Sequence, residues 1–171
     1  LRLAAVDQGR GDLAAAAGRL RTALEAFAAA NDAPGQVTAL EHLALLLALA
    51  GRWDQAADCL ERALELVAGA GDKVAEVVLN QNLAPMLRRA GRAAESLAAY
   101  ERMGLAAQEL GDHQRLALAL VGVGTLQAEA GSLAPALKNL AQAEAVYREL
   151  GQMTRANQVR EEIQRLEARE A

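Results

Sequence analysis

The feature that most constrains how this chain of 171 residues can fold is a motif that recurs every 40 residues. Each copy opens on a glycine, and the four glycines are Gly11, Gly51, Gly91 and Gly131. Twenty residues after each of them comes a second turn residue, in the series Asn31, Gly71, Gly111 and Gly151. Self-similarity at a fixed period is typical of repeat proteins, which stack copies of one small unit. Four copies in register, without an insertion, therefore predict such an array.

Each copy is predicted to contain two helices. In the second copy they run over 52–70 and 73–89, where apolar residues recur at spacings of three and four and so share one helix face. Gly71 can adopt the left-handed conformation that ends a helix, and Asp72 can cap the first N–H groups of the next one. The same roles recur at Asn31 and Asp32 and at Gly111 and Asp112.

Composition and small residues at fixed positions predict how the helices pack. Hydrophobic residues make up 53 % of the chain but aromatic residues only 2 %, so the apolar content is mainly Ala and Leu, both strong helix formers. Five residues after each leading glycine stands a small residue, in the series Ala16, Ala56, Ser96 and Ala136. A longer side chain there would force the two helices of a unit apart, at a cost of about 1–3 kcal/mol. Because neither helix can bury its apolar stripe alone, we expect an all-α solenoid of antiparallel helix pairs.

The residues around the leading glycine resemble the tetratricopeptide repeat. On both sides of Gly51 the chain has Leu43, Ala44, Leu47, Trp53, Ala56, Leu60 and Ala63 at the family's positions. On both sides of Gly91 it has Leu83, Ala84, Leu87, Ser96 and Tyr100 at these positions. The resemblance covers essentially the whole chain, and the 40-residue period is similar to the longer variant of kinesin light chains and bacterial regulators. It implies a right-handed superhelix. The departures are Leu13, Ala93 and Leu133 at the position of Trp53, and a polar Gln127.

The repeat frame predicts a single domain, 1–171, that ends in a solvating helix over 151–171. Before that helix come a truncated unit and three full ones, predicted at 1–30, 31–70, 71–110 and 111–150. In the last helix Val159, Ile163 and Leu166 form one apolar stripe, as a capping helix requires. At the other end the apolar residues are Leu1, Leu3 and Val6. We expect them to leave the stack open, and further repeats or another domain to precede residue 1.

Charge and composition argue against several classes of partner. The formal net charge of −4 does not fit nucleic-acid binding, which requires a basic face. The longest apolar run, at 43–50, is far shorter than the roughly 18 residues of a membrane span. The single cysteine, Cys59, fits a reducing cytosol, and no secretory signal is recognisable at the start. We therefore expect a cytoplasmic protein that binds neither nucleic acid directly nor a membrane.

No group of residues predicts catalysis or a metal site. The chain has no Gly-rich phosphate loop, paired-His metal motif or serine elbow, so we expect no enzyme activity and no cofactor. The two histidines, His42 and His113, are far apart in the repeat array and are interpreted as helix-surface residues. Cys59 is interpreted as a small buried hydrophobic residue. Trp53 is interpreted as a packing residue between helices, with a ligand contact as the alternative.

The resemblance also implies a binding surface, because in this family the first helix of each unit lines a concave groove. The corresponding positions here are Thr38, Glu41, Leu45, Val78, Gln81, Asn82, Arg88, Leu118, Val121 and Thr125, followed by Gln158, Glu161 and Arg165 on the last helix. Asn82 matches an Asn that can contact a bound peptide's backbone in long-period members, whereas the Lys and Asn pattern of the carboxylate clamp is missing. Such a mixed surface can hold an apolar segment and fix its backbone. The alternative is that these residues only pack neighbouring helices.

Pro85 conflicts with its surroundings. It removes a backbone hydrogen bond inside the predicted helix 73–89 and is expected to kink the helix axis. Its predicted place is the groove wall, where a kink would reshape the binding surface. The alternative is a tolerated surface irregularity.

The function predicted from these observations is a non-enzymatic scaffold that binds a peptide or a protein segment and is part of a larger bacterial regulatory protein. The first alternative is a structural module that self-associates, as a homodimer, through its open end or its apolar groove. A second alternative, an enzyme or a phosphatase regulator, is borrowed from family relatives. It requires a catalytic Gln or Asp that the sequence does not identify.

Overall fold

The computed structural model describes residues 13–168, which form eight α-helices and no strand. The helices are α2 (Leu13–Ala29), α3 (Ala33–Leu49), α4 (Trp53–Ala68), α5 (Lys73–Arg89), α6 (Ala93–Glu109), α7 (His113–Glu129), α8 (Leu133–Glu149) and α9 (Met153–Glu167). The chain divides into two compact units, Leu1–Arg92 (unit 1) and Ala93–Ala171 (unit 2). The described helices of unit 1 are α2 to α5, and those of unit 2 are α6 to α9.

The turns have the chemistry that the sequence predicts. Gly71 and Gly111 have φ angles of +67° and +68°, and Asn31 adopts the same left-handed region at +53°. After each of these turns an aspartate carboxylate accepts a hydrogen bond from the backbone N–H three residues later, at 2.9 Å. These N-cap pairs are Asp32–Gly35, Asp72–Ala75 and Asp112–Arg115. Because every turn ends one helix and starts the next, successive helices begin 20 residues apart.

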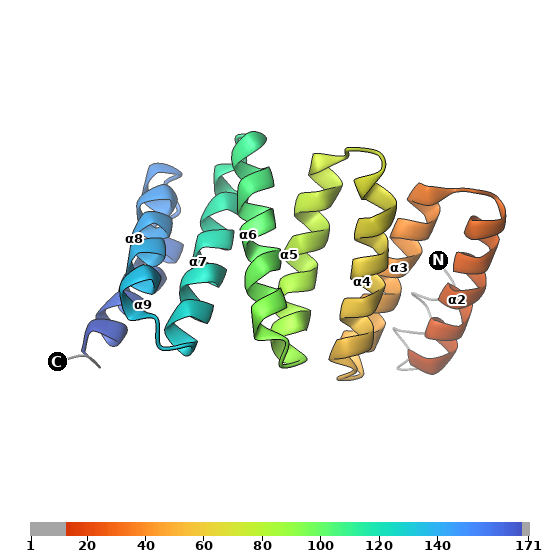
Figure 1. Cartoon of the computed structure of the whole chain (residues 1–171), viewed down its shortest axis with the longest axis horizontal. Helices are drawn as coiled ribbons and strands as arrows, with labels where there is room; N and C mark the ends of the chain where they lie inside the picture. The colour runs from red at the N-terminus through yellow and green to blue at the C-terminus, as the bar shows by residue number, and fades with distance from the viewer. Residues whose placement is uncertain (1–12, 169–171) are drawn as a thin grey trace. The chain divides into compact units, whose positions relative to one another are not determined.

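In unit 1 each helix packs against the next, so that α2 to α5 form consecutive antiparallel hairpins (Figure 1). Most of the large buried side chains are leucines from α3, α4 and α5, namely Leu40, Leu60, Leu79, Leu83 and Leu87. Ala16 and Ala56 are fully buried, each with 0 % exposure. These are two of the positions where the sequence predicts a small residue at a close approach of helices.

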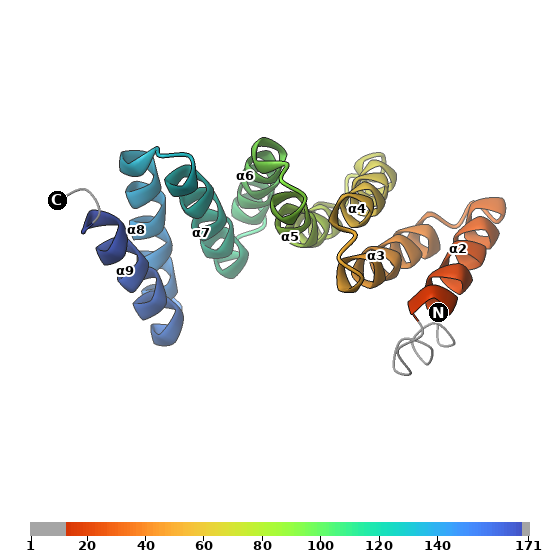
Figure 2. The same ribbon diagram turned by 90° about the horizontal axis from the view of Figure 1, so that it is seen from below.

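Unit 2 repeats this arrangement with α6 to α9 (Figure 2). Its core cluster consists of Ala117, Leu140, Ala143, Tyr147, Ala156, Val159 and Leu166. Ser96 and Ala136, the small residues of this unit, are also fully buried. Ile163 packs against the core cluster, so the apolar stripe predicted for the last helix lies in the interior as expected.

The predicted fold class, an all-α array of antiparallel helix pairs, is confirmed. The helix expected over 52–70 runs from Trp53 to Ala68, and the helix expected over 73–89 has those bounds. The single domain and its unit boundaries stay predictions. The expectations for Gly11 and for the open end formed by Leu1, Leu3 and Val6 lie outside the described residues.

Candidate functional site

Unit 1 contains a hollow of ≈ 290 Å³ between α3 and α5, called here the unit-1 hollow. Its lining residues come from α3, α4 and α5, and are Glu41, His42, Ala44, Leu45, Leu60, Asn82 and Met86. Residues four apart on a helix share a face, which explains why Glu41 and Leu45 come together opposite Asn82 and Met86. Leu45 is 48 % exposed, whereas Ala44 and Leu60 are buried. The hollow therefore has apolar residues both at its floor and at its rim.

A polar pair joins the two helices beside these apolar residues. Nδ2 of Asn82 donates a hydrogen bond to Oε1 of Glu41 at 3.5 Å, and both side chains are half-buried. This length is beyond the usual range for an N–H···O bond, so the pair is weak and can be exchanged for bonds to a ligand. A carboxylate and an amide together can accept a peptide N–H and donate to a peptide C=O. The arrangement suits recognition of a peptide backbone.

Three of the seven groove positions predicted on unit 1, Glu41, Leu45 and Asn82, meet at this hollow. The remaining four, which do not line it, are Thr38, Val78, Gln81 and Arg88. The Thr38 hydroxyl donates to the backbone carbonyl of Pro34 at 3.0 Å. Val78 and Gln81 are half-buried on α5, and Arg88 is exposed. Binding at any of these seven positions stays a prediction.

Pro85 lies inside α5 without ending the helix. It is exposed, and it does not line the unit-1 hollow although Asn82 and Met86 on either side of it do. An exposed proline leaves its part of the backbone accessible to water, which helps to explain why an interior proline is tolerated here.

The groove positions predicted on unit 2 lie along α7 and are half-buried, namely Leu118, Val121 and Thr125. Val121 packs against the core cluster of α7, α8 and α9, so its side chain already has apolar partners. On α9, Gln158 and Glu161 are exposed, and Nη1 of Arg165 pairs with Oε2 of Glu162 at 2.6 Å. A binding role for these positions also stays a prediction.

Unit 2 contains a larger hollow that the sequence analysis missed. This unit-2 hollow has a volume of ≈ 470 Å³ and is lined by α6, α7 and α8. Its main apolar lining residues are Leu105, Leu116, Leu120 and Val123, and its polar ones include Glu101, Gln108, Gln127, Asn139 and Gln142. The sequence signal that could have revealed it is Gly104, another lining residue. Gly104 stands where the other copies have Leu24, Leu64 and Glu144.

The side chains with reactive potential are dispersed. Cys59 is buried, and burial raises the pKa of its thiol more than nearby Arg62 lowers it, which disfavours the reactive thiolate. His42 is exposed at the unit-1 hollow, and His113 is exposed at the start of α7. Trp53 contacts Arg89, whose guanidinium carbon lies 5.3 Å from the ring centroid, in line with a packing role.

Two absences hold for residues 13–168. No cluster of three or more His, Cys, Asp and Glu side chains in this range is arranged to hold a metal ion. Nor does any of these helices combine the length and apolar character of a membrane span.

Residues 1–68 match the family model of the tetratricopeptide repeat. No curated protein sequence gives a significant match. Among solved structures, the chain is similar to BtubC (BKLC) from P. vanneervenii, with a TM-score of 0.65 and 23 % identity over 97 % of this chain and 77 % of that one.

Two other solved structures show the same fold. One is a STAND protein (Signal Transduction ATPase with Numerous Domains) from Pyrococcus horikoshii, which has a tetratricopeptide repeat sensor. Its TM-score is 0.69 and its identity 17 %, over 88 % of this chain and 23 % of that chain. The other contains the tetratricopeptide-like repeats of a putative kinesin light chain from Podosopora anserina. Its TM-score is 0.52 and its identity 18 %, over 98 % of this chain and 93 % of that chain.

Proposed function

We propose that this chain is a scaffold that binds a protein or peptide segment at the unit-1 hollow, because residues 1–68 match the tetratricopeptide-repeat family and the described helices have the fold of such repeats. Tetratricopeptide repeats mediate protein–protein interactions, and their fold is a scaffold type rather than a catalytic one. The observation that supports this site is the apolar hollow itself, with Leu45 and Met86 beside the weak Asn82–Glu41 hydrogen bond.

The occupant that suits this hollow is one apolar side chain of an extended segment. A volume of ≈ 290 Å³ is at the lower end of small-molecule pockets, which measure about 300–1,000 Å³. Asn82 has both a donor and an acceptor, so it can bond one peptide unit of such a segment while Glu41 accepts a neighbouring N–H. Met86 can adapt its unbranched side chain to anchors of different shape. Backbone bonds then fix the segment, and the hollow selects the side chain.

We also infer that the chain works within a larger regulatory protein in the cytoplasm. The support for the first point is the similarity to a STAND protein with a repeat sensor, of which the aligned region makes up 23 %. The support for the second is Cys59, a buried free cysteine. A bacterial origin and membership of the long-period variant stay predictions.

A pair of variants on α3 tests the site. Leu45→Glu places a charge at the rim of the hollow, and Leu49→Glu places one on the same helix outside the lining. Because the two leucines are 48 % and 58 % exposed, neither change should disturb the fold, which circular dichroism can verify.

The partner would be captured from source cells on the unaltered chain, and its binding segment would then be titrated as a synthetic peptide. We expect Leu45→Glu to weaken peptide binding at least about tenfold, since it removes a buried apolar contact, and Leu49→Glu to leave it unchanged. Equal affinities of the two variants would exclude the unit-1 hollow as the site.

Self-association is the second candidate function. Leu45 and Leu49 lie one helical turn apart on α3, at 48 % and 58 % exposure, and form a small apolar stripe that two copies could bury together. Sedimentation equilibrium across a concentration series tests this. A mass that doubles with concentration, and no longer doubles in Leu49→Glu, would support a dimer. A monomer at every concentration would exclude it.

A further inference from the structure

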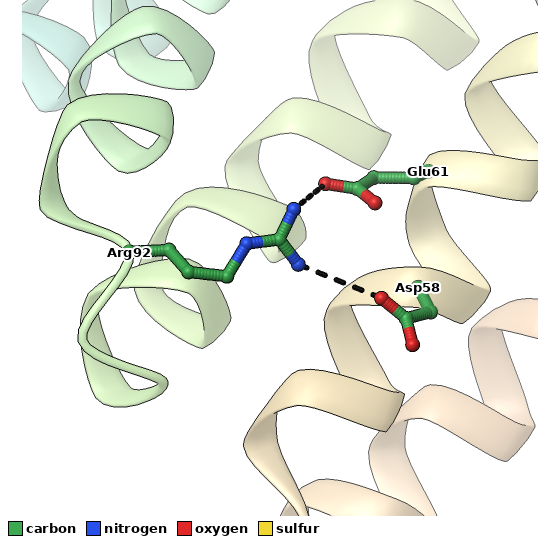
Figure 3. A network of polar contacts seen from close by, with 3 residues as sticks. All are labelled: Asp58, Glu61 and Arg92. Carbon is green, nitrogen blue, oxygen red and sulfur yellow. Dashed lines mark hydrogen bonds and ion pairs between the residues drawn. The ribbon is translucent and has the colours of Figure 1, made fainter.

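Unit 1 contains an ion-pair cluster centred on Arg92, with which unit 2 can be compared. The guanidinium of Arg92, in the turn after α5, contacts two carboxylates on α4 (Figure 3). Nη2 lies 2.8 Å from Oε1 of Glu61, and Nη1 lies 3.5 Å from Oδ1 of Asp58. The cation therefore joins the end of α5 to α4, the helix that precedes it.

Unit 2 has one of the two carboxylates of this cluster but neither the other nor the cation, because Ala98 stands forty residues after Asp58. Forty residues after Glu61 stands Glu101, whereas the residue forty after Arg92 is Ser132. Glu101 is exposed on α6 and has no ion pair or hydrogen-bond partner for its side chain within the described residues. At this position of the repeat, unit 2 thus presents an acceptor without the cation that Glu61 has in unit 1.

The unit-2 hollow lies beside this carboxylate, because Glu101 is one of its lining residues. It arises where two helices face each other with small residues, Gly104 on α6 and Ala119 on α7. A Cβ atom added to Gly104 would lie 3.3 Å from that of Ala119. In unit 1 the corresponding residues are Leu64 and Leu79 on α4 and α5, and Leu24 and Ala39 on α2 and α3. The helices α6 and α7 therefore approach closely at Gly104, and the hollow opens beside this contact, where α6, α7 and α8 supply apolar lining residues for a group from outside.

The rim of the hollow is suited to a polypeptide. Leu105 is 65 % exposed and extends the apolar surface outward from the floor. Gln108 and Gln142, from α6 and α8, are exposed amides whose side chains have no partner in the described part of the chain. Amides with free donors and acceptors can bond the backbone on either side of a bound apolar residue.

We propose that the unit-2 hollow is a second docking site, which binds a partner segment carrying an apolar anchor and a nearby arginine. The anchor fills the space over Gly104, and the guanidinium takes on Glu101 the place that Arg92 has on Glu61. Charge complementarity favours this occupant, because Glu101 is the one charged side chain in the lining. This site is not equivalent to the unit-1 hollow, which lies between α3 and α5 and for which an occupant without a required arginine is proposed. It therefore goes beyond the function proposed above.

A peptide selection on the whole chain tests this. Random 12-residue peptides displayed on phage are selected on the unaltered protein, and the most enriched one is synthesised with a fluorescent label. We expect enriched peptides to combine a large apolar residue with an arginine. In fluorescence anisotropy titrations, the analogue with citrulline in place of arginine should bind about threefold to tenfold more weakly, because it keeps the shape and loses the charge.

Variants of the protein locate the contacts. Glu101→Gln should cause the same loss as citrulline, and the two changes together should cause no further loss. Glu149 is an exposed carboxylate on α8, outside the lining of the hollow. Glu149→Gln is therefore the matched control and should leave the affinity for the peptide unchanged. Gly104→Leu restores the residue type of Leu24 and Leu64 and should abolish binding by filling the hollow. Since it can strain the contact with Ala119, Leu105→Gln provides an exposed alternative that should weaken binding without affecting the fold.

Ser132→Arg tests the internal comparison directly. It should supply the missing cation from within the chain, raise the stability of unit 2 and reduce the affinity for the arginine peptide.

Several outcomes would overturn the proposal. These are a selection that enriches no peptide, enriched peptides without a basic residue, and affinities that Glu101→Gln and Leu105→Gln leave unchanged. A peptide that is lost with Leu45→Glu but not with Glu101→Gln binds the unit-1 hollow, which supports the proposed function and contradicts the second site. A dimer in sedimentation that Leu105→Gln dissociates would assign the hollow to a second copy of the chain instead.

Discussion

Replacing Arg92 by methionine should destabilise unit 1 by about 1 kcal/mol. The perturbation removes the guanidinium that joins the turn after α5 to Glu61 and Asp58 on α4, and keeps most of the apolar stem. Exposed ion pairs contribute about 0.2–1 kcal/mol. The contact with Glu61 belongs at the upper end, because the atoms are 2.8 Å apart and the two side chains are 26 % and 36 % exposed. The contact with Asp58 belongs at the lower end, since it measures 3.5 Å and Asp58 is 62 % exposed.

Urea denaturation followed by far-ultraviolet circular dichroism measures this difference, with equal m-values as the condition for comparing free energies of unfolding. A double-mutant cycle with Glu61→Gln isolates the pair, and we expect a coupling energy of about 0.5–1 kcal/mol. Raising the salt concentration to about 1 M shortens the Debye length to about 3 Å and should reduce the coupling. A coupling below about 0.2 kcal/mol would refute the assignment of Arg92 as a link between α4 and the end of α5, and with it the reference for the second docking site.

Three further predictions concern turns, pH and reactivity. Gly71→Ala should cost about 1–2 kcal/mol in unfolding free energy because φ is +67°, whereas Gly18→Ala, on the exposed surface of α2 with no atom within 4 Å of the added Cβ, should gain about 0.5–1 kcal/mol. Burial alone would raise the pKa of Asp112, but hydrogen bonds from the backbone N–H and guanidinium of Arg115 lower it below 3.8. Its charge therefore stabilises the fold above that pH, and the advantage of the wild type over Asp112→Asn should disappear as unfolding is measured at progressively lower pH. Cys59, whose thiol pKa is raised, should react with iodoacetamide at pH 8 at least about tenfold more slowly in the native protein than in urea.

The fold could be predicted because its determinants are local and recur. A residue in left-handed conformation followed by an aspartate ends one helix and caps the next, and this chemistry can be read at Gly71 and Asp72 without tertiary information. Small residues at fixed register, such as Ala56, indicate where paired helices approach. Helix bounds were therefore accurate to within about two residues, as the start at Trp53 and the end at Ala68 show.

The candidate sites were less predictable because they depend on which side chains are missing as well as on which are present. The family resemblance assigned Glu41, Leu45 and Asn82 to the helices that line the groove, and these three residues line one hollow. It could not reveal that the Val121 side chain packs against the core cluster of unit 2, because that contact depends on the position of neighbouring helices. The unit-2 hollow could not be predicted, because it depends on how side chains from α6, α7 and α8 fill the space between these helices.

The repeat offers a way to interpret such departures, because each copy serves as a reference for the others. Where α4 and α5 have the half-buried Leu64 and the buried Leu79, α6 and α7 have Gly104 and Ala119, and so this seam forgoes part of the apolar burial that a leucine contributes, which is about 1.5–3 kcal/mol for a fully buried side chain. Ser132 stands at the position of Arg92 in the next copy, so unit 2 has no ion pair there. Both changes reduce the stability of the same helical seam, and each leaves a group, one apolar and one anionic, for which a partner can substitute. The two departures leave complementary features at one hollow, one apolar and one anionic, and the proposed ligand would engage both with one segment.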